Sequence, residues 1–305
     1  MFSFLRVIRF PNLIIIALSQ FLVRYCLIIP AFQTQYNYTN YFPSHLSKLQ
    51  FSLLVLSTVL IAAAGNIIND VFDIYTDDIN KPGKNLIGKL ISADAAKNLF
   101  YVLCSIGIII GFYLAFKIGK PVMGFIQAFA AGSLWMYSTY YKKKVLAGNI
   151  LVALLSALVL LLVGFFEPEF YPNIIYLLIY SGFAFAISLI REIIKDMEDL
   201  EGDERTQRKT LPVLAGIGRS KIVVLVLLFA TVAALAFVLY TFFYHSTVIS
   251  FWNLVALVEI PFFALTYLVI SAREKRDFHF ASTFAKLIMI VGVFSLFPFY
   301  YFFLR

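Results

Sequence analysis

The acidic stretch at residues 66–84 has side chains suited to metal chemistry. Read as a helix, it places Asn69, Asp73 and Asp77 on one face, because residues four apart are neighbours on a helix surface. Carboxylate and amide oxygens are the ligands that a hard divalent ion such as Mg²⁺ prefers, and Mg²⁺ commonly binds phosphate as well. The stretch therefore predicts a metal site that can hold a phosphorylated substrate.

The acidic pattern D-x-x-D-x-x-x-D occurs twice in the chain. Its first copy is Asp70, Asp73 and Asp77, and its second copy is Asp196, Asp199 and Asp203. The basic residues that follow the two copies are Lys81 and Lys84, and then Arg205, Arg208 and Lys209. One acidic cluster alone is as easily explained by a solvated helix end. Two clusters of equal spacing, each followed by bases, favour a metal–diphosphate site at the membrane.

The composition is typical of a membrane protein. Of the 305 residues, 61% are hydrophobic and 14% are charged, whereas soluble domains have about 45–50% and about 25%. Apolar runs of about 20 residues can cross a bilayer as helices. Nine such spans are predicted, at residues 11–31, 51–72, 96–117, 121–141, 147–166, 172–193, 220–243, 250–271 and 280–303. The expected fold is all-α, a polytopic bundle of nine transmembrane helices around a central cavity.

A single transmembrane domain is expected over residues 1–305. Each acidic cluster ends an even-numbered span, which predicts an internal repeat covering about 1–144 and 145–276, followed by a ninth helix at 280–303. Most of the 25 lysines and arginines fall on one side of the predicted bundle, together with the N-terminus and both acidic clusters. By the positive-inside rule, that side is expected to be the cytoplasmic side of the inner or plasma membrane of the cell, and the C-terminus is expected on the opposite side.

Other kinds of site are disfavoured. Cys26 and Cys104 both fall in apolar spans, so a structural disulfide or a cysteine-based metal site is not expected. The three histidines, His45, His245 and His279, lie far apart in the sequence without ligand spacing. The net charge of +8 could suggest nucleic acid, but no basic patch interleaved with aromatic residues supports that partner.

The acidic and basic residues of the two motifs are suited to a reaction in which diphosphate is the leaving group. Breaking a carbon–oxygen bond to diphosphate builds negative charge, which Mg²⁺ and nearby cations neutralise. The apolar interior of the bundle suits a long polyprenyl chain. Some of the 33 Phe and 18 Tyr residues could stabilise an allylic cation, although ordinary packing against lipid explains most of them better.

The motifs resemble those of the UbiA-type intramembrane prenyltransferases. The resemblance consists of Asn69-Asp70-x-x-Asp73-x-x-x-Asp77, Asn80-Lys81-Pro82, Asp199-x-x-x-Asp203, Arg9-x-Pro11-Asn12 and Tyr137-Ser138-x-x-x-Lys142. Within that family, residues 65–70, 191–203 and 209–212 are most similar to the digeranylgeranylglyceryl phosphate synthase branch.

The resemblance implies roles for individual residues. One Mg²⁺ would be held by Asn69, Asp73 and Asp77, and a second by Asp199 and Asp203, with Asp196 beside them. The residues implied to face the diphosphate are Lys81, Lys84, Tyr137, Lys142 and Lys209, and those implied to border the acceptor pocket are Arg9 and Asn12.

We therefore expect a Mg²⁺-dependent prenyltransferase whose partners are a polyprenyl diphosphate, an acceptor and the lipid bilayer. The resemblance implies a geranylgeranyl donor and geranylgeranylglyceryl phosphate as acceptor. Asp196 and Glu192 are our two candidates for the group that takes the proton from the acceptor hydroxyl. One alternative is an aromatic quinone precursor of the 4-hydroxybenzoate, homogentisate or dihydroxynaphthoate type. Others are an ion-coupled secondary transporter and a family member that only binds lipid.

Overall fold

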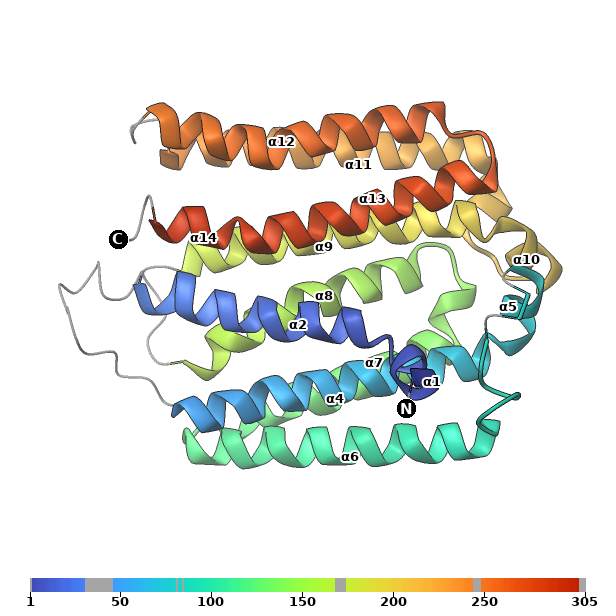
Figure 1. The fold of residues 1–305 in the computed structure, drawn as a ribbon, viewed down its shortest axis with the longest axis horizontal. Helices are drawn as coiled ribbons and strands as arrows, with labels where there is room; N and C mark the ends of the chain where they lie inside the picture. Colours follow the sequence, from blue (N-terminus) through green and yellow to red (C-terminus); the bar gives the residue numbers. More distant parts are fainter. Residues whose placement is uncertain are drawn as a thin grey trace.

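Long helices run side by side through almost the whole of the described chain (Figure 1). The computed structural model describes residues 2–30, 46–80, 82–83, 85–167, 174–243 and 248–301. The helices are α1 (Phe2–Val7), α2 (Phe10–Leu22), α4 (Lys48–Phe72), α5 (Ile74–Asn80), α6 (Ala93–Lys117), α7 (Phe125–Thr139), α8 (Ala147–Phe166), α9 (Ile174–Glu198), α10 (Leu200–Arg205), α11 (Leu211–Phe243), α12 (Val248–Ser271), α13 (Lys275–Phe294) and α14 (Leu296–Phe299). Short helical segments of other types are the π-helix η1 (Val23–Ile28) and the 3₁₀-helices η2 (Pro121–Gly124) and η3 (Tyr141–Lys143).

Seven segments of the described chain are long and apolar enough to cross a membrane. They are Phe10–Ile28, Lys48–Phe72, Ala93–Lys117, Ala147–Phe166, Ile174–Glu198, Leu211–Thr241 and Lys275–Phe299. The predicted spans at 121–141 and 250–271 correspond to α7, which has 15 residues, and to α12, in which Glu259–Ser271 is a shorter apolar helix. The predicted all-α membrane fold is confirmed, while the number of nine spans and the internal repeat stay predictions.

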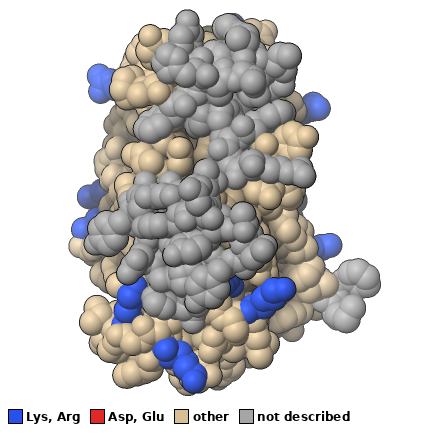
Figure 2. All heavy atoms as spheres, turned by 90° about the vertical axis from the view of Figure 1, so that its left-hand side faces the viewer, with Lys and Arg blue, Asp and Glu red and all other residues tan. Residues whose placement is uncertain are grey.

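The long helices lie roughly parallel, with α11 and α12 along one side of the bundle and α6 along the other (Figure 1). Between them, α4 packs against α6 and α7, and α9 packs against α8 and α13. The short helices α5 and α10 lie together at one end of the bundle, where they contact each other. This end gathers the acidic motifs. In the view of the opposite end in Figure 2, lysine and arginine side chains are visible, and none of the described residues in view is acidic.

Each acidic motif contains a break between two helices. Asp73 separates α4 from α5 with φ −96° and ψ 0°, and Asp199 separates α9 from α10 with φ −93° and ψ 10°. These dihedrals lie in the bridge region, where many active-site residues occur. The prediction of one continuous helix through residues 69–77 is therefore wrong at Asp73. No glycine or proline marks the break in the sequence, so helical periodicity alone could not reveal it.

A buried ion pair connects two spans where α8 ends. Arg24 Nε lies 2.9 Å from Oε1 of Glu167, and the two side chains are 4% and 0% exposed. Arg24 also donates to the carbonyl oxygen of Leu46 over 2.7 Å, and its guanidinium lies over the ring of Phe51. Because a buried charge without its partner is costly, this pair should fix how η1 packs against the end of α8.

We expect Glu167→Ala to lower the free energy of unfolding by about 3–5 kcal/mol, because it leaves the Arg24 guanidinium buried beside an apolar side chain. Thermal unfolding in detergent measures the loss. Lys97→Ala is the control, since it removes one partner of the exposed Lys97–Asp94 pair, and a change of less than about 1 kcal/mol is expected. Equal effects of the two substitutions would contradict this prediction.

Candidate active site

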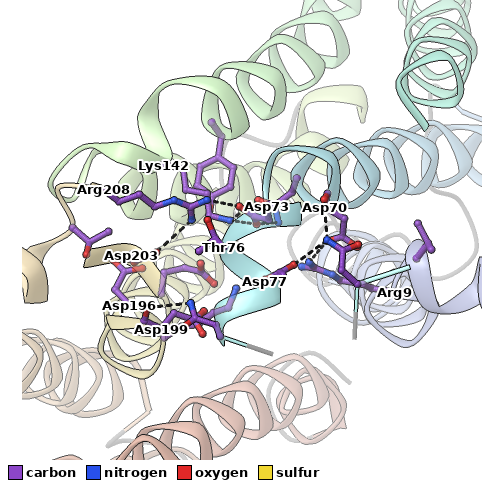
Figure 3. A pocket seen from close by; sticks show the side chains of 18 of the residues that line it. Arg9, Asp70, Asp73, Thr76, Asp77, Lys142, Asp196, Asp199, Asp203 and Arg208 are labelled. Atoms are coloured by element: carbon purple, nitrogen blue, oxygen red, sulfur yellow. Dashed lines mark hydrogen bonds and ion pairs between the residues drawn. The ribbon is translucent and has the colours of Figure 1, made fainter. Parts of the chain in front are cut away.

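The two acidic motifs face each other across one polar cavity of about 430 Å³ (Figure 3). Its charged lining residues are Arg6, Arg9, Asp70, Asp73, Asp77, Lys142, Glu192, Lys195, Asp196, Asp199, Asp203 and Arg208. The first motif enters from the junction of α4 and α5, and the second from the junction of α9 and α10. The packing of α5 against α10 thus brings together carboxylates that are more than a hundred residues apart in the chain.

Asp73 lies at the centre of the polar contacts. Its carboxylate forms ion pairs with Lys142 and with Arg208, whose Nη2 lies 2.7 Å from Oδ1. Asn69 donates from Nδ2 to Asp73 Oδ2 over 2.7 Å and accepts from Lys142 Nζ over 2.8 Å. Burial alone would raise the pKa of Asp73, but the two cations outweigh it and hold that pKa well below its usual range. Asp73 is therefore a charged carboxylate, 4% exposed.

The second motif shares a cation with the first. Asp203 Oδ1 lies 3.4 Å from Nη1 of Arg208, so Arg208 bridges the two motifs. Burial raises the pKa of Asp203 to about 6, against the opposing effect of Arg208. Asp196 accepts a hydrogen bond from Nδ2 of Asn149 over 2.8 Å. A divalent cation placed between these carboxylates would favour their charged forms.

Asn80 links the two acidic motifs through hydrogen bonds. It ends α5, and its side chain donates to the carbonyl oxygen of Asp199 over 3.1 Å and accepts from the backbone N–H of Gly202 over 3.0 Å. Its own carbonyl accepts from Nζ of Lys275, at the start of α13, over 2.9 Å. Gly202 is required at this contact, because a Cβ there would lie 2.3 Å from Asn80 Nδ2.

A second, apolar cavity of about 370 Å³ adjoins the polar one. Both are lined by Arg9, Asn69, Tyr137, Glu192 and Lys195. Most of the remaining wall of the apolar cavity is aliphatic or aromatic and comes from α2, α4, α7, α8, α9 and α13. The arrangement offers a charged compartment at the end of the bundle and an apolar compartment that extends between the spans.

The donor set of the polar cavity fits Mg²⁺ held partly by substrate. Among the described residues, no group of three or more His, Cys, Asp or Glu side chains is arranged to hold a metal ion by itself. Mg²⁺ is usually bound by one or two carboxylates together with waters and phosphate oxygens, rather than by a cage made entirely of protein. Pairs of carboxylates facing a cavity with room for phosphate meet that requirement.

The structure brings together most of the predicted site residues. Those in the wall of the polar cavity are Arg9, Asn69, Asp73, Asp77, Tyr137, Lys142, Asp196, Asp199 and Asp203. Asn12 lines the apolar cavity beside Arg9. Lys81 and Lys84 lie outside the described residues. Lys209 is not in either cavity wall, and its backbone N–H donates to the carbonyl oxygen of Lys143. The roles of these residues stay predictions.

Several residues of the cavity were not among the predicted site residues. Arg208 is one, although it belongs to the basic run after the second motif. A left-handed turn at Gln207, with φ 56°, precedes it, and Arg208 rather than Lys209 reaches Asp73. Lys195 also lines the cavity, and its place within the second acidic run could have indicated this. No local signal in the sequence points to Asn80 as a contact of Gly202.

Comparisons with known proteins agree with these features. Residues 29–293 match the model of the UbiA prenyltransferase family. The chain is 33% identical over 213 residues to the digeranylgeranylglyceryl phosphate synthase of Methanobrevibacter smithii, covering 69% of this chain and 73% of that one. It is 28% identical over 251 residues to the same enzyme of Methanosphaera stadtmanae, covering 82% and 88%.

Solved structures share the fold. One of them, from work on digeranylgeranylglyceryl phosphate synthase in membranes, superposes with a TM-score of 0.65 at 26% identity and covers 96% of both chains. A UbiA homologue from Archaeoglobus fulgidus, bound to GPP and Mg²⁺, superposes with a TM-score of 0.64 over 96% of this chain and 98% of that one. At 17% identity this second likeness concerns the fold alone. With its matching family model, bundle and paired acidic motifs, the chain belongs to the UbiA prenyltransferase family.

Proposed function

We propose that this membrane protein transfers a geranylgeranyl group from its diphosphate to the free hydroxyl of geranylgeranylglyceryl phosphate, with Mg²⁺ as cofactor. The main support is the pair of adjoining cavities, one charged and one apolar, which matches a substrate with a diphosphate head and a long apolar chain. Relatives named digeranylgeranylglyceryl phosphate synthase, similar over most of their length, support this acceptor.

The carboxylates of both motifs would hold the cofactor. Asn69, Asp73 and Asp77 would ligate one Mg²⁺, and Asp199 and Asp203 another. When bound there, Mg²⁺ would neutralise the negative charge that develops on the leaving diphosphate.

Lys142 and Arg208 would bind the diphosphate directly. Both already lie beside Asp73, and each has further N–H groups that can donate to phosphate oxygens. The planar guanidinium of Arg208 can form two parallel hydrogen bonds to one phosphate, whereas Lys142 acts as a point charge. Tyr137 lies between the two cavities, and the amine of Lys142 is 5.6 Å from its ring centre.

The reaction breaks the bond between C1 of the prenyl chain and the diphosphate oxygen, and both electrons leave with the diphosphate. The allylic cation that remains is captured by the hydroxyl oxygen of the acceptor, which forms the new ether bond. The hydroxyl proton goes to a carboxylate. Asp196 and Glu192 both line the polar cavity and are the candidates for this base.

The cavity end of the bundle is proposed to face the cytoplasm, with the N-terminus on the same side and the C-terminus on the other. The accumulation of lysine and arginine on the predicted loops of that side supports this orientation. A water-soluble product, diphosphate, would then leave into the cytoplasm, while both lipid chains stay in the bilayer.

A turnover assay tests the function. Purified protein is incubated with radiolabelled geranylgeranyl diphosphate, Mg²⁺ and either geranylgeranylglyceryl phosphate or 4-hydroxybenzoate, with EDTA as the metal control. The proposal predicts label in a phosphate-bearing ether lipid, lost with EDTA. Label in the aromatic product alone would show that the acceptor is an aromatic quinone precursor and not the glycerol lipid. Transfer to neither acceptor would overturn the proposed reaction.

We expect Asp73→Ala and Asp199→Ala each to lower kcat by on the order of 10³-fold, because each removes a carboxylate that would hold Mg²⁺ against the diphosphate. The same labelled assay measures the loss. The matched control is Asp78→Asn: Asp78 follows Asp77 directly but is about half exposed and is not in the cavity wall. Full activity in either alanine variant would contradict the metal assignment.

Gly202→Ala should displace the Asn80 side chain and shift α10 relative to α5. Misplacement of catalytic groups by about 1 Å can cost on the order of 10²-fold in rate, and a loss of that size in kcat/KM is expected. Gly182→Ala serves as the control on α9, since a Cβ there meets nothing within 4 Å. Unchanged turnover in folded Gly202→Ala protein would refute a positioning role for the Asn80 contact.

A further inference from the structure

A group of cationic side chains lies where the two cavities adjoin, apart from the bases that contact Asp73. The charged residues in the wall of the apolar cavity are Arg9, Arg191, Glu192 and Lys195. Lys286, on α13, donates from Nζ to Oδ1 of Asn12 over 2.5 Å, and Asn12 belongs to the same wall. Met289, one turn further along α13, lines the cavity too. Three helices, α2, α9 and α13, thus contribute to this cationic cluster.

The cluster has more positive charge than its neighbours neutralise. Arg9 is paired with Asp70 over 2.7 Å. Arg191 contacts Glu192 over 2.5 Å, but its Nε is buried with no hydrogen-bond partner in the described part of the chain. Lys286 has only the neutral amide of Asn12 as a hydrogen-bond acceptor among the described residues, and the charges of Arg191 and Arg9 repel it. Cations within spans are costly and usually mark a functional site. Here, an anion in the cavity would relieve their repulsion.

We propose that Arg191 and Lys286, with Asn12 and Arg9, bind the phosphate group of the acceptor lipid. The inference rests on the proposed function, whose acceptor has a phosphate as well as a free hydroxyl. Arg191 would donate from its unsatisfied Nε, and Lys286 would donate from its ammonium. The prenyl chain of the acceptor would extend into the adjoining apolar wall.

This position separates the two phosphorylated groups of the reaction. Arg191 precedes Asp199 by eight residues, which corresponds to about 12 Å along a helix. Lys195 and Glu192 lie between them on α9 and line both cavities. A phosphate bound at Arg191 therefore stays away from the carboxylates that would hold Mg²⁺. Separate cations for the acceptor prevent its phosphate from competing with the donor diphosphate for the metal.

The test compares geranylgeranylglyceryl phosphate with geranylgeranylglycerol, which lacks the phosphate. Wild-type protein should prefer the phosphorylated acceptor, and Arg191→Gln and Lys286→Met should each raise its KM by about tenfold or more, because each removes a charge-assisted hydrogen bond. The KM for geranylgeranyl diphosphate should stay within about twofold of wild type, since this donor is held elsewhere. Lys97→Met, an exposed cation outside both cavities, is the control.

A metal-free binding measurement gives an independent readout. Geranylgeranylglyceryl phosphate in EDTA should raise the Tm of wild-type protein, and it should not raise the Tm of the Lys286→Met variant. Lys286→Arg keeps the positive charge, so the lipid should still raise the Tm of this variant. The comparison of the two variants separates loss of charge from loss of fold.

Two results would overturn the inference while the proposed function stands: equal use of both acceptors by wild-type protein, or an unchanged acceptor KM in both folded variants. Absence of transfer to geranylgeranylglyceryl phosphate by wild-type protein would instead overturn the proposed function, and the phosphate site with it.

Discussion

The buried carboxylate of Asp73 is the contact on which the arrangement of the cavity depends. It pairs with Lys142, which follows α7, and with Arg208, which follows α10. Arg208 in turn reaches Asp203, so three segments distant in the chain meet at one charge. In a low-dielectric site a carboxylate without cations would become protonated or destabilise the fold. The pairing keeps Asp73 ionised, as the proposed metal ligand must be, and it places beside it the two cations that we propose bind the diphosphate.

The two acidic motifs share more than their spacing. In each, the middle aspartate interrupts a helix with nearly the same dihedrals, and a short helix carries the third aspartate into the cavity. Asn80 then joins the two short helices through the backbone of the second motif. The acids thereby approach from two sides without forming a complete metal cage, and a Mg²⁺ ion held by them would keep coordination positions for phosphate oxygens. This geometry suits a cofactor that binds together with its substrate.

The sequence predicted the apolar spans and both acidic motifs from local composition and spacing, and the resemblance to the family motifs indicated Lys142. It did not predict the features that depend on distant contacts. Asn80 and Asp199 are 119 residues apart, and Lys286 and Asn12 are 274 apart. The 15-residue length of α7 was also missed, because the predicted span at 121–141 includes Pro121, which opens a 3₁₀ turn before the helix. Proline is tolerated in the first turn of a helix, so hydropathy alone cannot set that boundary.

An EPR titration with Mn²⁺ as a substitute for Mg²⁺ measures whether the two motifs bind metal and diphosphate cooperatively. The chain would be titrated with and without an unreactive thio-analogue of geranylgeranyl diphosphate. Tight binding of two ions per chain is predicted only with the analogue present, and its loss is predicted when Asp73 and Asp199 are both replaced by alanine. Equally tight Mn²⁺ binding in that double variant would contradict the account.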